Sequence, residues 1–484
     1  MIKQISSLNE LGIGIVYFRG FQDLLEKNLG SIQAIEIEPQ TLWYEDGSDQ
    51  GYRIDVTQNE ILNSYPLPKV FHGVGSPIGG SVLPSDNTLA TLKAHIKALN
   101  PLWLSEHLSF NSFPDGDCLT NTNFLLPQVQ NEQGIETAVK AIRHYRECIN
   151  LPFAFETGVN YLKPLKHEIP DGRFVAEIAE KADCNILLDL HNVMTNQVNG
   201  RQTVSAFISQ LPLHRIMEIH LASGFFFRDY YLDAHSGISN DNLIGLAEGI
   251  VRKLPNLKLI VFEMLPEFLP SLSDGDFEKQ IIAMRRIWDM RGRNFRVQKK
   301  RKNTIHSSGL GNHIPVKDWE YTLGKLCLGQ PLLGNDLVRE LGDDKGIKII
   351  NELIFHFRAS AVVSSLKLTT RLLRFSLGEE NFNELLKEFF NNSKPDLFPF
   401  RVALDFSDFL GSKNPDVPFL EDLVSFEVAT IKTISDDRVR EVKFSYNPFP
   451  VFRSLNNNEL PEEQTDPVKF IITIKPDESI EESV

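Results

Sequence analysis

The amino-acid sequence predicts an α/β fold: a (β/α)8 barrel of the TIM type, followed by a smaller, mainly helical domain with a C-terminal β-strand portion. Eight short apolar runs alternate with segments of helical apolar spacing in the first part of the chain. Strands that alternate with helices in this way close into a barrel. Six of the runs end in a carboxylate or a histidine, at the position where such a barrel carries its chemistry.

The predicted strands are rich in β-branched or aromatic residues and are bounded by Pro, Gly or Asn. In chain order they are residues 12–17, 32–38, 68–74, 102–110, 152–158, 185–192, 215–223 and 258–264. Apolar residues at helical spacing mark the segments 21–29, 88–99, 137–148, 172–182, 204–211 and 242–254. The two kinds of segment alternate, which predicts parallel strands joined by helices.

Six ionisable side chains stand at the ends of six successive predicted strands: His72, His107, Glu156, Asp189, His220 and Glu263. The C-terminal strand ends of a barrel meet at one rim. A single histidine at a strand end is usually a hydrogen-bonded rim or core residue, and this simpler interpretation applies to each one alone. Six together are costly to bury unless they are paired or bind metal, so the set predicts a metal centre.

Three further donors adjoin this set. Asn192 follows the sixth strand, and Asp233 and His235 lie in the loop after the seventh. All nine side chains offer oxygen or nitrogen, which suits iron, manganese or zinc. One ion uses about six positions, so nine donors predict a multinuclear site. His191 lies beside Asn192, and neighbouring residues of an extended chain point to opposite sides, so we interpret it as a supporting or structural residue.

Composition restricts the class of protein. The chain has 484 residues, 42% of them hydrophobic, which is enough for two domains. A net charge of −14 argues against nucleic acid as a partner. No apolar run approaches the ~20 residues of a membrane span, so we expect a cytoplasmic protein without a membrane partner. The cysteines show no C-x-x-C spacing and are expected to be reduced structural thiols: Cys118, Cys148, Cys184 and Cys327.

The donor residues lie in runs that resemble a known family. The runs are FHGVGSPIG, LSEHLSF, FETGVN, LLDLHNVMTN, EIHLAS, LDAHSG and FEMLPE, within about residues 10 to 293. They look like the motifs of the multinuclear non-heme iron-dependent oxidases, the MbnB-like family typified by the methanobactin biosynthesis oxygenase. The resemblance implies a metal-containing barrel that uses O₂ as co-substrate to oxidise a residue, often cysteine, in a ribosomally made precursor peptide.

The same resemblance implies roles for the donors on two or three iron ions, expected as a mixture of Fe(II) and Fe(III). It assigns His72 and His107 to one iron and Asp189 and His220 to a second. Glu156 and Glu263 would be shared between irons. A third, more weakly held ion would take Asn192, Asp233 and His235. The residues expected to act in catalysis are thus Glu156, Asp189, His220 and Glu263.

One departure from the family pattern adjoins the proposed ligands. Many relatives have a second histidine shortly after the IHLA run, whereas this chain has Ser223, Gly224 and three phenylalanines at 225–227. No proposed ligand is removed by this change. It predicts a substrate pocket that differs from that of the founding enzyme.

The basic stretch at 291–303 predicts a domain boundary. We expect an oxidase barrel at 1–293, a basic and polar linker at 294–313, and a helical plus β peptide-recognition domain at 314–484. The runs at 440–455 and 466–476 look like strands. The segment 382–429 resembles the MbnC-like partner protein of these oxidases, through Phe406, Phe409, Leu410, Phe419, Leu420, Leu423 and Glu427. An ordinary helical core has the same apolar spacing.

If the partner is fused, no separate partner protein is required. Two other classes of function are compatible with the pattern. Carboxylates and histidines on a barrel rim also position zinc or manganese in hydrolases and isomerases that act on phosphoesters or sugars. A non-catalytic, metal-containing peptide-binding protein is the other alternative. Iron content and O₂ consumption distinguish the first alternative, and a mass change in a co-expressed peptide distinguishes the second.

Overall fold

A computed structural model describes most of the chain. The described residues are 5, 8–45, 51–166, 168–292, 314–330, 332–334, 336–396, 398–436, 438–462, 468–477 and 479–483. The predicted linker 294–313 lies outside them. Contacts divide the chain into two compact units. The first contains residues 1–43, 54–119 and 125–350, and the second contains 44–53, 120–124 and 351–484.

The first unit contains a closed barrel of eight parallel strands, in the order β1-β14-β11-β10-β9-β6-β5-β2. Their bounds are β1 (Gly12–Tyr17), β2 (Ala34–Ile37), β5 (Lys69–Gly73), β6 (Leu104–His107), β9 (Phe153–Glu156), β10 (Asn185–Asp189), β11 (Ile216–Leu221) and β14 (Leu259–Phe262). Nearly every strand residue is buried, as expected for a parallel sheet covered on both faces. The predicted fold class is confirmed.

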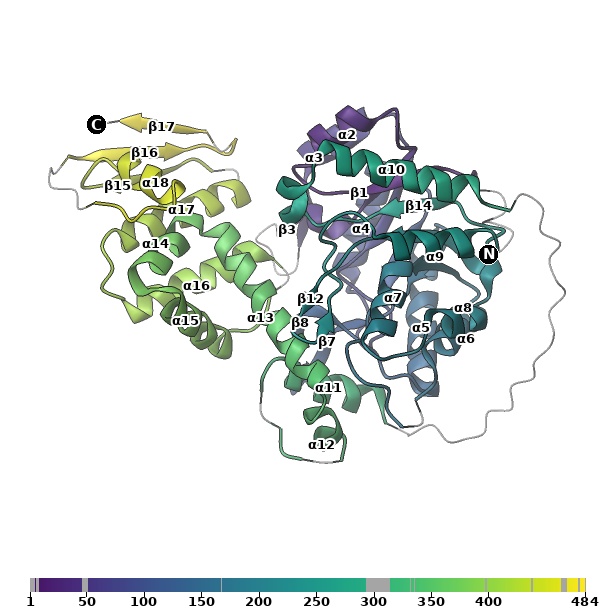
Figure 1. Ribbon diagram of the computed structural model, residues 1–484. Coiled ribbons are helices and arrows are strands. Elements are labelled where there is room, and N and C mark those ends of the chain that lie inside the picture. Colours follow the sequence, from purple (N-terminus) through teal and green to yellow (C-terminus); the bar gives the residue numbers. More distant parts are fainter. Residues whose placement is uncertain are drawn as a thin grey trace. The chain divides into compact units, whose positions relative to one another are not determined.

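Helices surround this barrel (Figure 1). They are α2 (Gln22–Asn28), α3 (Val56–Ser64), α4 (Asp86–Leu99), α5 (Glu132–Cys148), α6 (Asp171–Ala182), α7 (Leu190–Val198), α8 (Val204–Gln210), α9 (Asp241–Val251) and α10 (Asp274–Asp289). Side-chain oxygens cap several N-termini, for example Ser85 on α4 and Asn131 on α5. Seven of the eight strands are shorter than the predicted runs; β10, for example, ends at Asp189, because this residue caps α7.

Short hairpins interrupt the strand and helix alternation. They are β3 (Trp43–Glu45) with β4 (Tyr52–Ile54), β7 (Phe110–Asp115) with β8 (Cys118–Leu126), and β12 (Phe226–Phe227) with β13 (Tyr230–Tyr231). The sequence pattern did not predict them, since their residues continue or follow apolar runs. The four cysteines, all among the described residues, form no disulfide, as expected, and two of them, Cys184 and Cys327, are buried.

Residues 314–350 lie with the barrel unit, which differs from the predicted boundary. This segment contains α11 (Val316–Cys327), α12 (Asp336–Gly342) and the start of α13 (Lys345–Ser365). The indole of Trp319 donates to the carbonyl of Pro127 at 2.8 Å. Gly324 lies against the buried ring of Phe113, which leaves no room for a Cβ atom. Close helix-to-hairpin packing therefore holds α11 to the barrel unit.

The second unit is mainly helical with a three-stranded antiparallel sheet, as predicted. Its elements are α14 (Lys367–Leu377), α15 (Glu379–Asn392), α16 (Pro399–Lys413), α17 (Leu420–Asp436), β15 (Arg440–Phe444), α18 (Phe449–Asn456), β16 (Phe470–Ile474) and β17 (Ile480–Ser483). The sheet order is β15-β16-β17. Phe406, Leu410 and Leu423 are buried in its core, and Phe409 and Phe419 pack against them. These apolar residues thus have a core role in this unit.

Among the helices that the structure describes, none is by itself long and apolar enough to cross a membrane. One pair, α13 with α14, reaches the required length and composition together, but it is bent by 112°.

The packing of α11 predicts opposite effects for two glycine substitutions. In Gly324→Ala the new Cβ would overlap a ring carbon of Phe113, so we expect a loss of about 1–3 kcal/mol in stability. In the control, Gly245→Ala in α9, no atom lies within 4 Å of the new Cβ. Alanine should be neutral there or stabilise by up to about 1 kcal/mol. Thermal unfolding of both variants measures this, and equal melting temperatures would contradict the packing of α11.

Candidate metal centre

The structure brings the predicted donors together inside the barrel unit. Three groups of side chains each place their ligand atoms within 4.8 Å of one another. They are His72 with His107 and Glu156, Glu156 with Asp189 and His220, and Asp189 with His235 and Glu263. Glu156 and Asp189 each belong to two groups, so the groups form one continuous cluster. Asn192 and Asp233 adjoin it through the contacts described below.

The first group lies at the ends of β5, β6 and β9. Oε2 of Glu156 is 3.1 Å from Nε2 of His72 and 2.8 Å from Nε2 of His107. The other nitrogen of each ring, Nδ1, is held by a hydrogen bond. Nδ1 of His72 is 2.8 Å from the hydroxyl of Ser105, and Nδ1 of His107 donates to the carbonyl of Gly73. Both imidazoles therefore turn Nε2 toward one carboxylate oxygen, which is how metal-binding histidines are usually oriented.

The second group joins β9, β10 and β11. Asp189 caps α7, because its Oδ1 accepts from the backbone N–H of Asn192 at 2.7 Å, and this leaves Oδ2 for another partner. The amide nitrogen of Asn192 donates to Oε1 of Glu156 at 3.0 Å. His220 is completely buried, and its Nδ1 is hydrogen-bonded to Oε2 of Glu263 at 2.9 Å. Asp189, Glu156 and His220 are thereby each held through one of their polar atoms.

The third group contains His235, which lies with Asp233 on the loop after β13. Nε2 of His235 is 3.1 Å from Oδ1 of Asp233, and its Nδ1 is 3.5 Å from Oε1 of Glu263. The side chains of Asp233 and His235 are 19% and 15% exposed, whereas those of His72 and Glu156 are 1% and 2% exposed. Asp233 is thus the most exposed of these ligands, and His235 is as exposed as His107, whose side chain is also 15% exposed.

His191 lies closer to the cluster than its predicted direction suggested. The expectation that it points away assumed an extended chain, but α7 already begins at Leu190. The ring is fully buried, and its Nε2 is 3.5 Å from Oδ1 of Asp233. A supporting position beside Asp233 follows from this geometry.

Charge pairing dominates the electrostatics of the cluster. Burial alone would raise the pKa of Glu156, but His107 and His72 hold it well below its ordinary value. Burial would also raise the pKa of Glu263, but His235 and His220 outweigh this effect and lower the pKa to about 2. The facing carboxylates raise the pKa of His107, His220 and His235 well above the ordinary value, against burial. The cluster therefore requires positive charge, which imidazolium or a metal ion supplies.

The donor atoms themselves fit a metal. Within the described part of the chain, several of them are buried without a hydrogen-bond partner: His72 Nε2, Glu156 Oε2, Asp189 Oδ2, Asn192 Oδ1, His220 Nε2, Asp233 Oδ1 and His235 Nε2. Buried polar atoms are normally hydrogen-bonded, so unsatisfied atoms that converge on one point indicate a binding site for another group. Nitrogen and oxygen donors in this number suit iron, manganese or zinc.

Several further buried carboxylates lie beside this cluster and were not predicted from the sequence, among them Glu36, Glu38 and Glu218. Glu36 and Glu38 lie on and just after β2, and Glu218 lies on β11 two residues before His220. Burial, reinforced by Glu263, raises the pKa of Glu38 to about 8. The signal was present in the sequence, because acidic residues alternate with apolar ones in IEIE and MEIH and therefore share one face of a strand.

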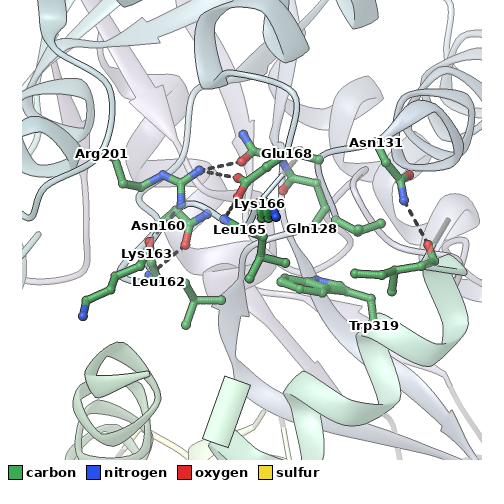
Figure 2. Close-up of a pocket in the computed structure, with 13 residues that line it drawn as sticks. Gln128, Asn131, Asn160, Leu162, Lys163, Leu165, Lys166, Glu168, Arg201 and Trp319 are labelled. Atoms are coloured by element: carbon green, nitrogen blue, oxygen red, sulfur yellow. Dashed lines mark hydrogen bonds and ion pairs between the residues drawn. The ribbon is translucent and has the colours of Figure 1, made fainter. Parts of the chain in front are cut away.

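A second polar cluster, around Arg201, has a different character (Figure 2). The buried guanidinium donates to Glu168, Asp171 and Gln130 and to the carbonyl of Leu162. The adjoining cavity, which also borders α11, measures about 20 Å³. That volume accommodates about one water molecule. Its charges are satisfied within the protein, so this cluster holds loops together and is not a substrate site.

Comparison with known proteins identifies relatives of the barrel. The model of a family described as RiPP precursor modification enzyme MbnB/TglH/ChrH matches residues 12–271. A UPF0276 protein of Chromobacterium violaceum is 28% identical over 238 residues, which cover 48% of this chain and 83% of that protein. A UPF0276 protein of Haemophilus influenzae is 26% identical over 287 residues, covering 55% and 88%.

Solved structures with a similar fold include D-psicose 3-epimerase from Clostridium cellulolyticum. It has a TM-score of 0.37 and 12% identity, and the match covers 57% of this chain and 97% of that one. Endonuclease IV from Thermus thermophilus has a TM-score of 0.36 and 13% identity, with coverage of 57% and 99%.

The exposure gradient predicts the order in which metal is lost. We expect the ion nearest Asp233 and His235 to leave first when the chain, loaded with Mn²⁺, is dialysed against rising chelator. A neutral amide and partly exposed ligands hold metal less tightly than buried shared carboxylates. Asp233→Asn should lack this first release step and keep the remaining ions. Release of all metal in one step, in both proteins, would contradict the ranking.

Proposed function

We propose that this chain is a multinuclear non-heme iron oxidase. The chain belongs to the MbnB/TglH/ChrH family of RiPP precursor modification enzymes. In this proposal it uses O₂ to oxidise a residue, with cysteine the preferred one, in a ribosomally made precursor peptide. The observation that carries the proposal is the continuous cluster of three donor groups joined through Glu156 and Asp189. Such a cluster suits several ions placed side by side.

Bound iron would supply an open position for a substrate thiolate and the electrons that O₂ reduction requires. The residues of the chain orient and neutralise this centre. Ser105 and the carbonyl of Gly73 hold the first two imidazoles, and Asn192 holds Glu156. The low exposure of Glu156 and His220 keeps water away from these ligands. Preorganised ligands in a dry site need little rearrangement when substrate binds.

The aromatic hairpin β12–β13 supports a peptide as the substrate. It comes directly before the loop that carries Asp233 and His235. Phe225 and Phe226 are 44% and 64% exposed, and the ring of Phe226 packs edge-on against Tyr231 at 5.0 Å. Exposed aromatic side chains next to a reactive site are suited to binding an extended peptide. The phenylalanines that depart from the family pattern would thus act in substrate binding.

Peptide recognition is proposed for the second unit. Its strand β15 forms one edge of the sheet, since only β16 pairs with it among the described strands. Val442 and Phe444 of β15 point into the core, while Glu441 and Lys443 are exposed. An extended peptide segment can add to such an edge through backbone hydrogen bonds. Because both functions reside in one chain, the local concentration of the recognition unit is high.

We expect the chain, purified without oxygen, to carry more than one iron. Glu156→Gln should lose at least one iron and nearly all activity, because a neutral amide cannot compensate the charge of two ions. Glu248→Gln removes a partly exposed carboxylate that pairs with Arg286 and lies outside the cluster, and it is the matched control. Elemental analysis and peptide mass after co-expression with short cysteine-containing peptides are the measurements. Full activity with zinc and without O₂ would instead indicate the hydrolase or isomerase class.

The recognition role predicts a local change in hydrogen exchange. The amides of Arg440–Phe444 should exchange more slowly when a peptide substrate is added, because an added strand protects the edge of β15. A peptide of the same composition in scrambled order is the control. The full chain is needed, since truncation near residue 303 would remove α11 from the barrel unit. Protection confined to the barrel would assign the second unit to stability instead.

A further inference from the structure

Two carboxylates lie inside the barrel beneath the rim cluster. Glu218 is on β11, two residues before His220, so both side chains point to the same face of the strand. Successive inward residues on a strand are about 6.6 Å apart, which places Glu218 one layer deeper. Glu36 comes from β2, and both carboxylates are completely buried. With His220 they form a fourth group whose ligand atoms lie within 4.8 Å of one another.

The contact between Glu36 and His220 is a close, fully buried ion pair. Oε1 of Glu36 is 2.9 Å from Nε2 of His220, yet both atoms lack a hydrogen-bond partner among the described residues. The same combination occurs in the rim cluster, where Nε2 of His72 and Oε2 of Glu156 are 3.1 Å apart and both unpartnered. Two ligands bound at about 2.1 Å to one ion lie about 3.0–3.4 Å apart. Donor atoms at this spacing that do not point at each other can both point at a shared ion.

The other nitrogen of His220 decides how its ring is used. Nδ1 is hydrogen-bonded to Oε2 of Glu263 at 2.9 Å, so the proton belongs on Nδ1 in a neutral ring. Nε2 faces Oε1 of Glu36 at 2.9 Å, so a positive centre is required there, which a proton on Nε2 or a bound ion supplies.

The surroundings supply little other compensation. The indole of Trp103 donates to Oε2 of Glu218 at 2.8 Å and fixes that carboxylate. Oε1 of Glu218 and both oxygens of Glu36 have no hydrogen-bond partner in the described part of the chain. Two buried carboxylates with unsatisfied oxygen atoms are costly, and a cation between them removes that cost.

We propose that Glu36, Glu218 and Nε2 of His220 form an inner metal position that takes a first-row divalent ion. It rests on the metal chemistry of the proposed function but requires neither O₂ nor peptide. The inner position adds two carboxylates to the nine rim donors. Nε2 of His220 has one lone pair, so it binds either this ion or a rim ion, and Trp103 and Glu263 orient the ligands of the inner position.

Equilibrium dialysis of the metal-free full chain against Mn²⁺ without oxygen tests this position. The double variant Glu36→Gln/Glu218→Gln should bind one equivalent of Mn²⁺ less than the natural chain, and Mn²⁺ should raise its melting temperature by less. The single variant Glu218→Gln is the safer one for folding, because its amide oxygen still accepts from Trp103. It should weaken Mn²⁺ binding at this position by at least tenfold.

The control is Glu320→Gln, a buried carboxylate that accepts hydrogen bonds from the backbone and hydroxyl of Ser81 and should leave Mn²⁺ binding unchanged. Equal stoichiometry and affinity in the double variant and the natural chain would overturn the inner position and leave the two glutamates sharing a proton. A natural chain that binds no Mn²⁺ or Fe²⁺ at all would overturn the proposed function as well. The two failures are thereby distinguished.

Discussion

Charge compensation inside the barrel mouth is the constraint on which the site depends. Carboxylates from five strands or strand ends converge where little water reaches them: Glu36, Glu156, Asp189, Glu218 and Glu263. Such groups are too costly to keep charged unless cations face them. The imidazoles of His107, His220 and His235 lie among them and shift toward the protonated form. An ion that displaces those protons meets a preformed site, which explains why protonation and metal binding compete for the same atoms.

The barrel makes this concentration of charge sustainable. Hydrogen-bonded parallel strands fix the spacing of the side chains, and the apolar residues that alternate with the donors fill the wall, as Ile35, Ile37 and Ile219 do. Layers of donors then follow from the two-residue period of a strand, with Glu218 below His220. The rigid barrel wall keeps like charges close together against their mutual repulsion. The side chains of Asp233 and His235, on the loop after β13, are partly exposed.

The strand ends could be predicted from sequence because a barrel brings its C-terminal ends together whatever the intervening chain does. All six strand-end donors therefore lie in one cluster. Glu36 and Glu218 were missed because they lie inside runs that were identified by their apolar neighbours. The direction predicted for the His191 side chain was wrong, because apolar spacing does not show where β10 ends and α7 begins. The association of α11 with the barrel depends on Gly324 meeting Phe113, a contact between residues more than 200 positions apart, and no local pattern carries such information.

Two segments of the first part of the chain belong to the second unit, and they bear on how a fused enzyme works. Residues 44–53 and 120–124 make their contacts there, as the ring of Tyr52 does with Phe398 at 5.6 Å. The second unit is therefore completed by chain that emerges from between barrel strands, in addition to the covalent connection through α13. A unit built in this way is connected to the barrel unit at several points along the chain. If the second unit binds the peptide, as proposed, the local concentration of that peptide at the barrel is set by these connections and not by diffusion of a separate partner.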